Sequence, residues 1–428
     1  MRTKVAFYTS GCRVNQAETA VLARSFEIEG FDLVDFPDPA DLFVVNTCTV
    51  TESGDADTRK VVNKIGRINP HSKIALIGCL SQIQKEKLLK MPRVQWVVGN
   101  ELKMDLAKIL KKTANSDQPL LFTPEISGKS FTMPVAGIDP KRTRANIKIQ
   151  DGCNCFCSYC EIPYARGRAR SREFDDILSK AQQLVTAGHK ELVVTGINVG
   201  AYHYKDKTII DVVNSLDLIK GLKRIRISSI EPTTIPVELL YKSSENSKLC
   251  RFFHIPLQSG NEKILTAMKR NYSVPEYLES ISKTITAIPD ACIGTDVIVG
   301  FPGETDKYFN ETLKLLSETP FTYFHVFSYS DRRLAKSRYL KNKVPAEKIE
   351  ARSRKLRELS ALKKTTYFER FINKTEYVLF EQKKNGYWTG LTDNYIRVNV
   401  ISESDIQNRL LPVILQSING QTMLGKLA

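Results

Sequence analysis

Three closely spaced cysteines lie in the segment DGCNCFCSYC, residues 151–160. Cys153, Cys157 and Cys160 form the pattern C-x3-C-x2-C, directly after the predicted strand NIKIQ. Three soft thiolates on one short loop are able to hold three irons of a [4Fe–4S] cluster and leave the fourth iron open to a ligand. The alternative is a zinc site, with Cys155 or a distant histidine as fourth ligand. We predict that Cys155 is not a ligand and points away, because a single residue separates it from each neighbour.

Three other cysteines are far apart in the sequence but occupy the same position relative to predicted strands. Cys12, Cys48 and Cys79 each follow an N-terminal apolar run, in KVAFYTSGC, LFVVNTC and KIALIGC. The loops that follow adjacent parallel strands gather at the carboxyl edge of a sheet, so these thiols would converge there. The pattern predicts a second metal site, and the alternative is three small buried hydrophobic side chains.

The remaining features of the cysteines and of the N-terminus bear on the cellular compartment. Cys250 and Cys292 lie at or just before predicted strands, and we expect them in the core. The segment MRTKVAFYTSGC lacks the pattern of a secretory signal, and no apolar run approaches the ~18 residues of a membrane-spanning helix. We therefore expect a cytoplasmic protein with reduced thiols and no membrane partner.

The elements that must position the N-terminal cysteines occupy residues 1–112. Buried strands are predicted at 4–8, 42–46 and 73–77, and amphipathic stretches such as 18–29 lie between them. This alternation predicts an α/β domain with a parallel sheet. Residues 113–144 lack periodicity and gather Ser, Thr, Pro and basic residues, which predicts a linker.

A second, longer alternation fills residues 145–331 and would carry the C-x3-C-x2-C loop. Six units of strand and helix in this length predict an open, partial (β/α)6 barrel rather than a full eight-stranded one. The fold class is therefore α/β. The predicted strands lie at 146–150, 191–196, 224–229, 251–257, 293–299 and 322–328.

The C-terminal part of the chain differs in charge and in pattern. Residues 332–364 hold 13 of the 63 Lys and Arg residues but only three Glu, so this segment carries +10 of the net charge of +16. A helix beginning at Pro345 is predicted within a basic connector at 332–368. Residues 369–428 then alternate about five short strands with polar turns, which predicts a small β-barrel.

Excess positive charge attracts polyanions, and we expect the connector and terminal barrel to bind RNA. A membrane surface is the alternative, but the predicted helix has only a thin apolar face. Tyr387, Trp388 and Tyr395 would stack on unpaired bases, unless they form the core of the barrel. The candidate phosphate contacts are Arg352, Arg354, Lys355, Arg357, Lys363 and Lys364.

Ordered motifs along residues 1–330 carry a family resemblance. A C-x3-C-x2-C loop after the first strand of a six-unit barrel resembles the radical S-adenosylmethionine (SAM) superfamily. Together with the second cysteine set and a tail that resembles a TRAM domain, an RNA-binding module, the chain resembles the methylthiotransferase family. The motifs are SGCRVNQAE (10–18), NTCTVT (46–51), IGC (77–79), DGCNCFCSYCEIPYARGRARSR (151–172), TGINVGAY (195–202), SSIEP (228–232), HIPLQSG (254–260), MKRNY (268–272) and TDVIVGFPGET (295–305).

The resemblance implies two 4Fe-4S clusters and two SAM molecules. The cluster on Cys153, Cys157 and Cys160 would cleave SAM to a radical, which breaks a C–H bond that side-chain acids and bases cannot break. The cluster on the N-terminal cysteines would supply or carry sulfur, and a second SAM would provide the methyl group. An electron donor such as flavodoxin or ferredoxin is implied as a partner.

Polar residues at the carboxyl ends of the predicted barrel strands are candidates to hold SAM. The resemblance adds Tyr159, at the position of an aromatic residue near the adenine. Arg166, Arg168, Arg170 and Arg172 would either meet the SAM carboxylate or tRNA phosphate, or form a solvated face. The strand-end candidates are Gly196, Asn198, Ser228, Glu231, Gln258 and Asp296.

The branch of the family is indicated by the residues after the first cysteine. Relatives that act on isopentenyladenosine in tRNA, or on a ribosomal protein aspartate, usually carry Asp-Ser-Glu, whereas this chain has Asn15-Gln16-Ala17-Glu18. Its motifs resemble the branch that methylthiolates C2 of N6-threonylcarbamoyladenosine at position 37, in the tRNA anticodon stem-loop. Methylthiolation of those other two substrates, and a non-enzymatic RNA-binding metalloprotein, are the alternative functions.

Overall fold

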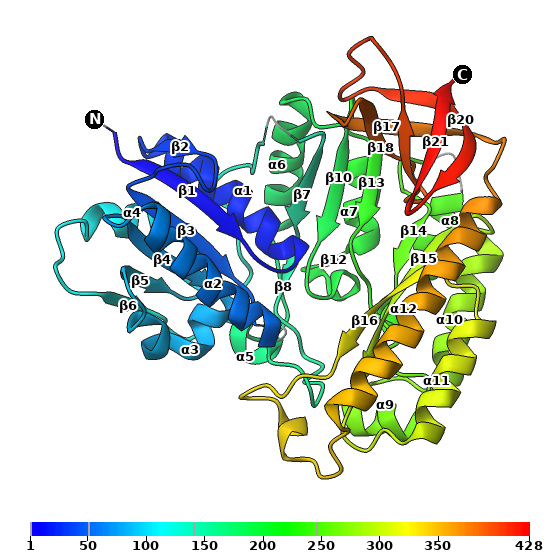
Figure 1. Cartoon of the computed structure of the whole chain (residues 1–428). Coiled ribbons are helices and arrows are strands. Elements are labelled where there is room, and N and C mark those ends of the chain that lie inside the picture. The colour runs from blue at the N-terminus through cyan, green and yellow to red at the C-terminus, as the bar shows by residue number, and fades with distance from the viewer. Residues whose placement is uncertain (1, 50–51, 140–141, 245–246) are drawn as a thin grey trace.

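The computed structural model describes residues 2–49, 52–139, 142–244 and 247–428, so the last two residues of the NTCTVT motif lie outside the described chain. Three units follow one another in chain order (Figure 1): an N-terminal α/β unit, an open α/β barrel and a small closed β-barrel. This architecture confirms the predicted fold class.

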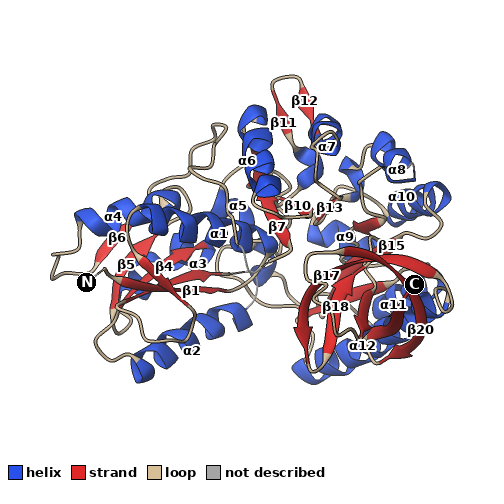
Figure 2. Cartoon of the chain, turned by 90° about the horizontal axis from the view of Figure 1, so that it is seen from above, coloured by secondary structure: helices blue, strands red, loops and turns tan. Residues whose placement is uncertain are grey.

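The N-terminal unit is a six-stranded parallel sheet in the order β2-β1-β3-β4-β5-β6. Helices α2 and α3 pack on one face and α1 and α4 on the other, which is why the central strands read as continuous apolar runs (Figure 2). The strands are β1 Lys4–Thr9, β2 Asp32–Val34, β3 Leu42–Thr47, β4 Lys73–Gly78, β5 Val94–Val98 and β6 Leu120–Phe122. The helices are α1 Arg13–Ile28, α2 Glu52–Ile68, α3 Cys79–Leu89, 3-10 helix η1 Lys103–Asp105 and α4 Leu106–Lys112.

Strands β1, β3 and β4 are the three N-terminal strands expected from the sequence, and they form the middle of the sheet beside β5. Strands β2, β5 and β6 were not predicted. Strand β6 lies inside the segment expected to be a linker and pairs with β5 at Trp96↔Leu120. An isolated run of three half-buried residues carries little signal in the sequence, because its position is decided by the strand beside it.

The barrel holds all six predicted strands, paired in the orders β13-β10-β7 and β14-β15-β16. A single parallel bridge, Ile225↔Leu249, joins the two halves, and no pairing of β16 with β7 is seen in the described part of the chain. The strands are β7 Arg144–Lys148, β8 Gln150–Asp151, β9 Arg170–Ser171, β10 Glu191–Thr195, β11 His203–Tyr204, β12 Lys207–Thr208, β13 Arg224–Ile227, β14 Phe252–His254, β15 Cys292–Val299 and β16 Tyr323–Ser328. The helices are α5 Ile162–Arg166, α6 Phe174–Thr186, α7 Ile209–Asp217, α8 Val237–Ser244, α9 Glu262–Met268, α10 Val274–Ala287 and α11 Asp306–Glu318, with 3-10 turns η2 Val199–Ala201 and η3 Pro232–Thr234.

The C-terminal part begins with the 3-10 helix η4, Lys336–Tyr339, and the long helix α12, Ala346–Glu369. Helix α12 runs along β16 on the outside of the barrel (Figure 1) and is preceded by Pro345, as predicted. Five strands then close into a barrel in the order β17-β18-β19-β21-β20, which confirms the expected small β-barrel. They are β17 Thr375–Lys384, β18 Tyr387–Leu391, β19 Arg397–Val400, β20 Leu410–Asn419 and β21 Thr422–Leu427.

Among the described residues, no helix combines the length and the apolar character needed to cross a membrane.

Helix α12 has one leucine that is fully buried against the barrel. Leu356 has no exposed surface and joins the barrel core, whereas Leu362, six residues further on, is 63% exposed. We predict that Leu356→Ala lowers the free energy of unfolding by about 2–5 kcal/mol, because it leaves a cavity under the helix. Leu362→Ala, the matched control, should change it by less than about 0.5 kcal/mol. Urea titration followed by circular dichroism measures both; equal losses would show that the helix does not dock through Leu356.

Candidate functional site

The strand register brings Cys12, Cys48 and Cys79 together at the carboxyl edge of the N-terminal sheet. Thr47 of β3 lies opposite Gly78 of β4, so Cys48 and Cys79 follow a paired couple of residues. Gly11 lies against Cys48 so closely that a Cβ added there would be 2.7 Å from the Cys48 Sγ, which only glycine permits. Cys48 and Cys79 are buried and Cys12 is exposed, so one side of the trio is open to solvent.

Two buried donors point at the Cys79 sulfur. The Arg166 Nε lies 3.1 Å from Cys79 Sγ, and the Asn100 Nδ2 lies 3.8 Å from it. Asn100 also donates to the Ala165 carbonyl at 2.6 Å. Hydrogen-bond donors of this kind commonly surround the sulfur ligands of an iron–sulfur cluster. The residues present therefore fit a cluster better than they fit three apolar core cysteines.

The C-x3-C-x2-C loop is shaped by its own backbone. The Cys153 N–H donates to the Gly167 carbonyl at 3.1 Å, and the Cys160 N–H donates to the Cys157 carbonyl at 3.0 Å. The Ile162 N–H, at the start of α5, lies 3.4 Å from Cys160 Sγ. The pKa of Cys153 is lowered, first by a hydrogen bond to Cys155, while the charges of Cys160 and Cys157 act on it in the opposite direction. This loop thus also supplies donors to a sulfur, as a thiolate-held cluster requires.

The prediction that Cys155 points away from this trio is wrong. Its backbone N–H lies 3.4 Å from Cys153 Sγ, and its thiol hydrogen bonds to that same sulfur. This hydrogen bond is the main cause of a lowered pKa at Cys153 and a raised pKa at Cys155. The alternation argument failed because Phe156, with φ of +47°, turns the loop through the left-handed region between Cys155 and Cys157.

Arg270 is a functional candidate that the sequence reasoning missed. Its guanidinium donates to Cys157 Sγ at 3.2 Å and to the Tyr159 hydroxyl at 3.3 Å, and it forms an ion pair with Glu231. Arg270 therefore connects the cysteine loop to two residues that were proposed to hold SAM. The signal was present, since MKRNY (268–272) was among the motifs, but no residue in that motif received a role.

Of the other proposed SAM residues, Gly196, Asn198, Ser228 and Gln258 follow barrel strands, whereas Asp296 lies within β15. Gly196 packs on Gln150, whose side-chain oxygen accepts the N–H of Asn198 at 2.9 Å. The Gln258 N–H donates to the Asp296 carbonyl at 2.8 Å. Ser228 follows β13 and donates to a neighbouring threonine at 3.2 Å. Contact of these residues with SAM stays a prediction.

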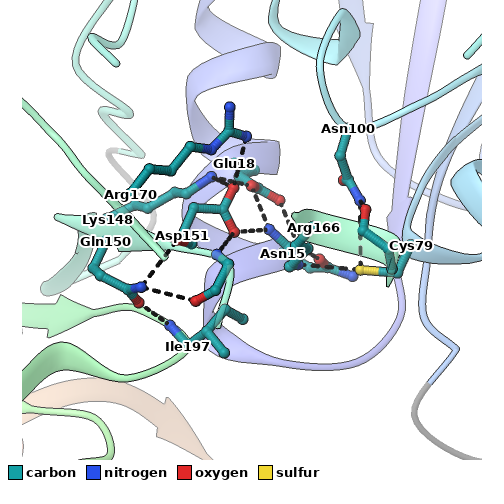
Figure 3. A network of polar contacts seen from close by, with 12 residues as sticks. Asn15, Glu18, Cys79, Asn100, Lys148, Gln150, Asp151, Arg166, Arg170 and Ile197 are labelled. Carbon is teal, nitrogen blue, oxygen red and sulfur yellow. Dashed lines mark hydrogen bonds and ion pairs between the residues drawn. The ribbon is translucent and has the colours of Figure 1, made fainter. Parts of the chain in front are cut away.

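A buried network of charges connects the two cysteine-bearing units (Figure 3). The Arg166 guanidinium donates to Glu18 of α1 at 3.0 Å and to Asp151 of β8 at 2.9 Å, and it also donates to Asn15 at 2.6 Å. Lys148 bridges the same two carboxylates at 2.6 Å each. Arg166 and Glu18 have no exposed surface. The side chain that donates to Cys79 is therefore anchored to both units at once.

The arginines after the cysteine loop do not form a solvated face. Arg166, Arg170 and Arg172 are buried or nearly so and are paired with Glu18, Glu101 or Asp151, and Asp176. Arg168 is the exposed member and lies over the Phe156 ring at 5.4 Å. Alternate spacing in the sequence could not distinguish solvent from acidic partners that come from other parts of the chain.

The candidate RNA contacts divide into exposed and structural residues. Arg354, Lys355 and Arg357 are exposed on α12. Lys363 is half-buried and donates to the Ser317 and Thr319 carbonyls, and Lys364 is half-buried against Phe368. Arg352 is only 6% exposed and binds Glu304 at 2.5 Å and Asp306 at 2.6 Å. Arg352 therefore anchors the helix, and the prediction that it contacts phosphate needs correction.

The aromatic candidates and the remaining cysteines belong mostly to a core between the two barrels. Trp388 is 7% exposed and packs inside the C-terminal barrel, and Tyr395 packs on Phe252 with ring centroids 4.4 Å apart. Tyr387 remains half-exposed. Cys250 and Cys292 are 1% exposed in the same core, which confirms their prediction as core residues.

The amino-acid sequence matches two protein families over the parts of the chain that carry the two cysteine trios. The radical SAM superfamily matches residues 147–316, and the uncharacterized protein family UPF0004 matches residues 4–99. The threonylcarbamoyladenosine tRNA methylthiotransferase MtaB of Bacillus subtilis (strain 168) is 35% identical, with 96% of this chain and 93% of that protein covered. A tRNA-2-methylthio-N(6)-dimethylallyladenosine synthase of Protochlamydia amoebophila (strain UWE25) is 31% identical, with 100% and 97% covered.

A solved structure shares the fold. The radical S-adenosylmethionine methyltransferase TsrM from Kitasatospora setae, with tryptophan substrate and a SAM analogue bound, superposes with a TM-score of 0.57. The match covers 76% of this chain and 73% of that chain at 15% identity.

The buried network predicts a loss of stability in acid. Burial alone raises the pKa of Glu18, but Arg166, Lys103 and Lys148 outweigh it and hold that pKa well below its usual range. A depressed pKa stabilises the folded state above the unfolded-state value near 4.3, and this contribution is lost as the pH falls further. We expect the free energy of unfolding to decrease steeply below about pH 4.5.

The substitution Glu18→Gln tests this expectation. It leaves buried cations without their carboxylate, so it should cost about 3–5 kcal/mol at pH 7 and should flatten the pH dependence. Glu27→Gln, on the exposed face of the same helix, is the matched control and should leave the profile unchanged. Unfolding midpoints between pH 3.5 and 7 measure the effect; an unchanged profile in Glu18→Gln would contradict it.

Proposed function

The chain belongs to the radical SAM methylthiotransferase family, and we propose that it adds a methylthio group to C2 of N6-threonylcarbamoyladenosine at position 37 of tRNA. The observation that carries the proposal is the pair of cysteine trios, which lie in separate units that Arg166 binds to each other. One trio suits SAM cleavage and the other suits delivery of sulfur, and the two must face the same base.

The residues present fit two iron–sulfur clusters. Cys153, Cys157 and Cys160 would hold one, and Cys12, Cys48 and Cys79 would hold the other. When bound with SAM, such clusters supply the radical chemistry that breaks an unactivated aromatic C–H bond. Three ligands at each cluster leave one iron open, which the chemistry requires at both.

The protein's own contribution is to hold the sulfurs and to orient the reactants. Arg270 donates to Cys157 while its ion pair with Glu231 keeps it in place. Arg166 does the same at Cys79 through Glu18 and Asp151. Each trio thus has one buried arginine that donates to a ligand sulfur, and a cation beside a thiolate-bound cluster stabilises its reduced, more negative state.

The proposed RNA surface consists of the exposed part of α12 and the C-terminal barrel. Because tRNA is the proposed partner, we expect the protein to act in the cytoplasm and to contact the anticodon stem-loop. A low-potential electron donor such as flavodoxin or ferredoxin would supply the electrons.

A reconstitution experiment tests the proposal. Anaerobic loading should give about eight irons per chain, four per cluster. With reductant and SAM, the enzyme should convert threonylcarbamoyladenosine in an anticodon stem-loop RNA to its methylthio derivative, as measured by mass spectrometry of the nucleosides. The triple variant Cys153→Ala, Cys157→Ala, Cys160→Ala should lose about half of the iron and all SAM cleavage.

The matched triple variant Cys12→Ala, Cys48→Ala, Cys79→Ala should lose the other half of the iron and all product, yet still cleave SAM. Cys250→Ala should keep all of the iron. Zinc in place of iron, or no SAM cleavage by the wild type, would favour the non-enzymatic RNA-binding metalloprotein. Product only on a dimethylallyladenosine (isopentenyladenosine) RNA, or on a ribosomal protein aspartate, would refute the proposed substrate.

The RNA surface gives a separate prediction. The combined variant Arg354→Gln, Lys355→Gln, Arg357→Gln removes exposed cations, so the slope of log affinity against log salt should become shallower by about 2–3. Lys283→Gln with Lys314→Gln, exposed on barrel helices and paired with glutamates, should leave the slope unchanged. Fluorescence anisotropy with the stem-loop RNA measures both; equal slopes would place the RNA elsewhere.

A further inference from the structure

A cluster of cationic, imidazole and aromatic side chains lies where helix α1, strands β14–β16, helix α12 and the C-terminal barrel meet. His254 Nε2 lies 2.9 Å from Asp296 Oδ1, and the His254 and His325 rings are 5.5 Å apart. The Tyr323 ring stacks on the Tyr395 ring at 6.4 Å. We call this group the junction cluster; its members are Arg13, His254, Asp296, Tyr323, His325, Lys364 and Tyr395.

Two cations of the junction cluster have no acidic partner. Arg13 donates to the Tyr395 hydroxyl at 2.9 Å, and Lys364 lies over the Phe368 ring at 5.4 Å. Among the described residues, no carboxylate forms an ion pair with either of them. Elsewhere in the described chain, half-buried and buried arginines are paired with acids or carbonyls, so Arg13 is unusual among the arginines.

The charges around His325 distinguish an anion site from a metal site. One ligand atom each of His254, Asp296 and His325 lie within 4.8 Å of one another, a set that is able to bind a divalent cation. The pKa of His325 is nevertheless lowered, first by desolvation and then by His254, with Arg13 and Lys364 acting in the same direction against Asp296. Arg13 is linked to the triad through Tyr395 and Tyr323, whose hydroxyl lies 3.4 Å from His254 Nδ1. Its positive charge, together with that of Lys364, repels a metal ion and attracts an anion.

The junction cluster is connected to both cysteine trios. Arg13 directly follows Cys12 at the start of α1. On the other side, the charge of Asp296 acts on Glu231, which is bound to Arg270, the donor to Cys157. The junction cluster is therefore connected to the N-terminal trio through Arg13 and to the second trio through Asp296, Glu231 and Arg270.

We propose that the junction cluster binds the carboxylate of the N6 substituent of the substrate base, with Arg13 and Lys364 as its charge partners. This inference rests on the proposed function. The threonylcarbamoyl group ends in a carboxylate and a hydroxyl, whereas the dimethylallyl group is a neutral hydrocarbon, so cations without acidic partners favour the former. Aromatic rings beside them reduce competing water and strengthen the charge interaction.

The test uses the reconstituted full-length enzyme and two anticodon stem-loop RNAs. They differ only in the threonyl carboxylate, which is intact in one and converted to the neutral carboxamide in the other. Wild-type kcat/KM should favour the carboxylate RNA by about tenfold or more, as one charge-assisted hydrogen bond implies. Arg13→Gln and Lys364→Gln should each reduce this preference toward one, and Arg13→Lys should keep part of it.

The controls separate binding of the carboxylate from damage to the protein. Arg24→Gln removes a cation from the same helix, at an exposed position paired with Glu27, and should keep the wild-type preference. Iron content is measured in Arg13→Gln because Arg13 adjoins a proposed ligand, and Lys364→Gln lies far in sequence from every cysteine. No preference in the wild type, or an unchanged preference in both glutamine variants, would overturn the inference. A wild type that modifies neither RNA would instead refute the proposed function on which it rests.

Discussion

One buried guanidinium is bound to both cysteine-bearing units and helps to hold them in their relative positions. Arg166 follows the C-x3-C-x2-C loop by only six residues, so it belongs to the barrel, yet it donates to Cys79 of the N-terminal sheet. A fully desolvated cation is costly unless carboxylates compensate it, and here one comes from each unit, Glu18 and Asp151. The units cannot shift apart without leaving buried charges unpaired. The relative position of the two sulfur sets is therefore determined by electrostatics as well as by apolar packing.

Buried arginines also attach the C-terminal barrel to the α/β barrel. Two arginines of strand β13 donate to backbone carbonyls of the C-terminal barrel. Arg224 donates to Leu391 at 2.7 Å. Arg226 donates to Thr392 at 3.1 Å and to Asp393 at 2.8 Å. These are backbone contacts, so they hold the loop after β18 in one conformation. Tyr395 lies two residues after Asp393. Its ring packs on Phe252 of β14, and its hydroxyl accepts a hydrogen bond from Arg13. The unit proposed to bring RNA is thus held against strands β13 and β14 of the barrel.

Individual residues show why part of the site was predictable and part was not. The cysteines could be assigned because each follows an apolar run, and parallel strands end at one edge whatever the details of packing. Arg352 was wrongly predicted to contact phosphate, and Trp388 was left with two alternatives. In both cases the sequence of the helix or strand does not show whether the side chain faces solvent or protein. Their partners, Glu304 for Arg352 and the apolar barrel core for Trp388, come from other elements. Local periodicity carries no information about such partners.

The order of the three units, nine of the strands in the sheet and barrel, the five strands of the terminal barrel and the two sets of cysteines could all be predicted from the amino-acid sequence. These follow from hydrophobic alternation and from spacing along the chain, which are local properties. Which cations lack an acidic partner became clear from the folded structure alone. Arg166 and Arg352 are bound to buried carboxylates, whereas Arg13 and Lys364 meet no acid among the described residues. The reason is physical: the availability of a charge depends on what lies within a few ångströms of it, and those neighbours are distant in sequence.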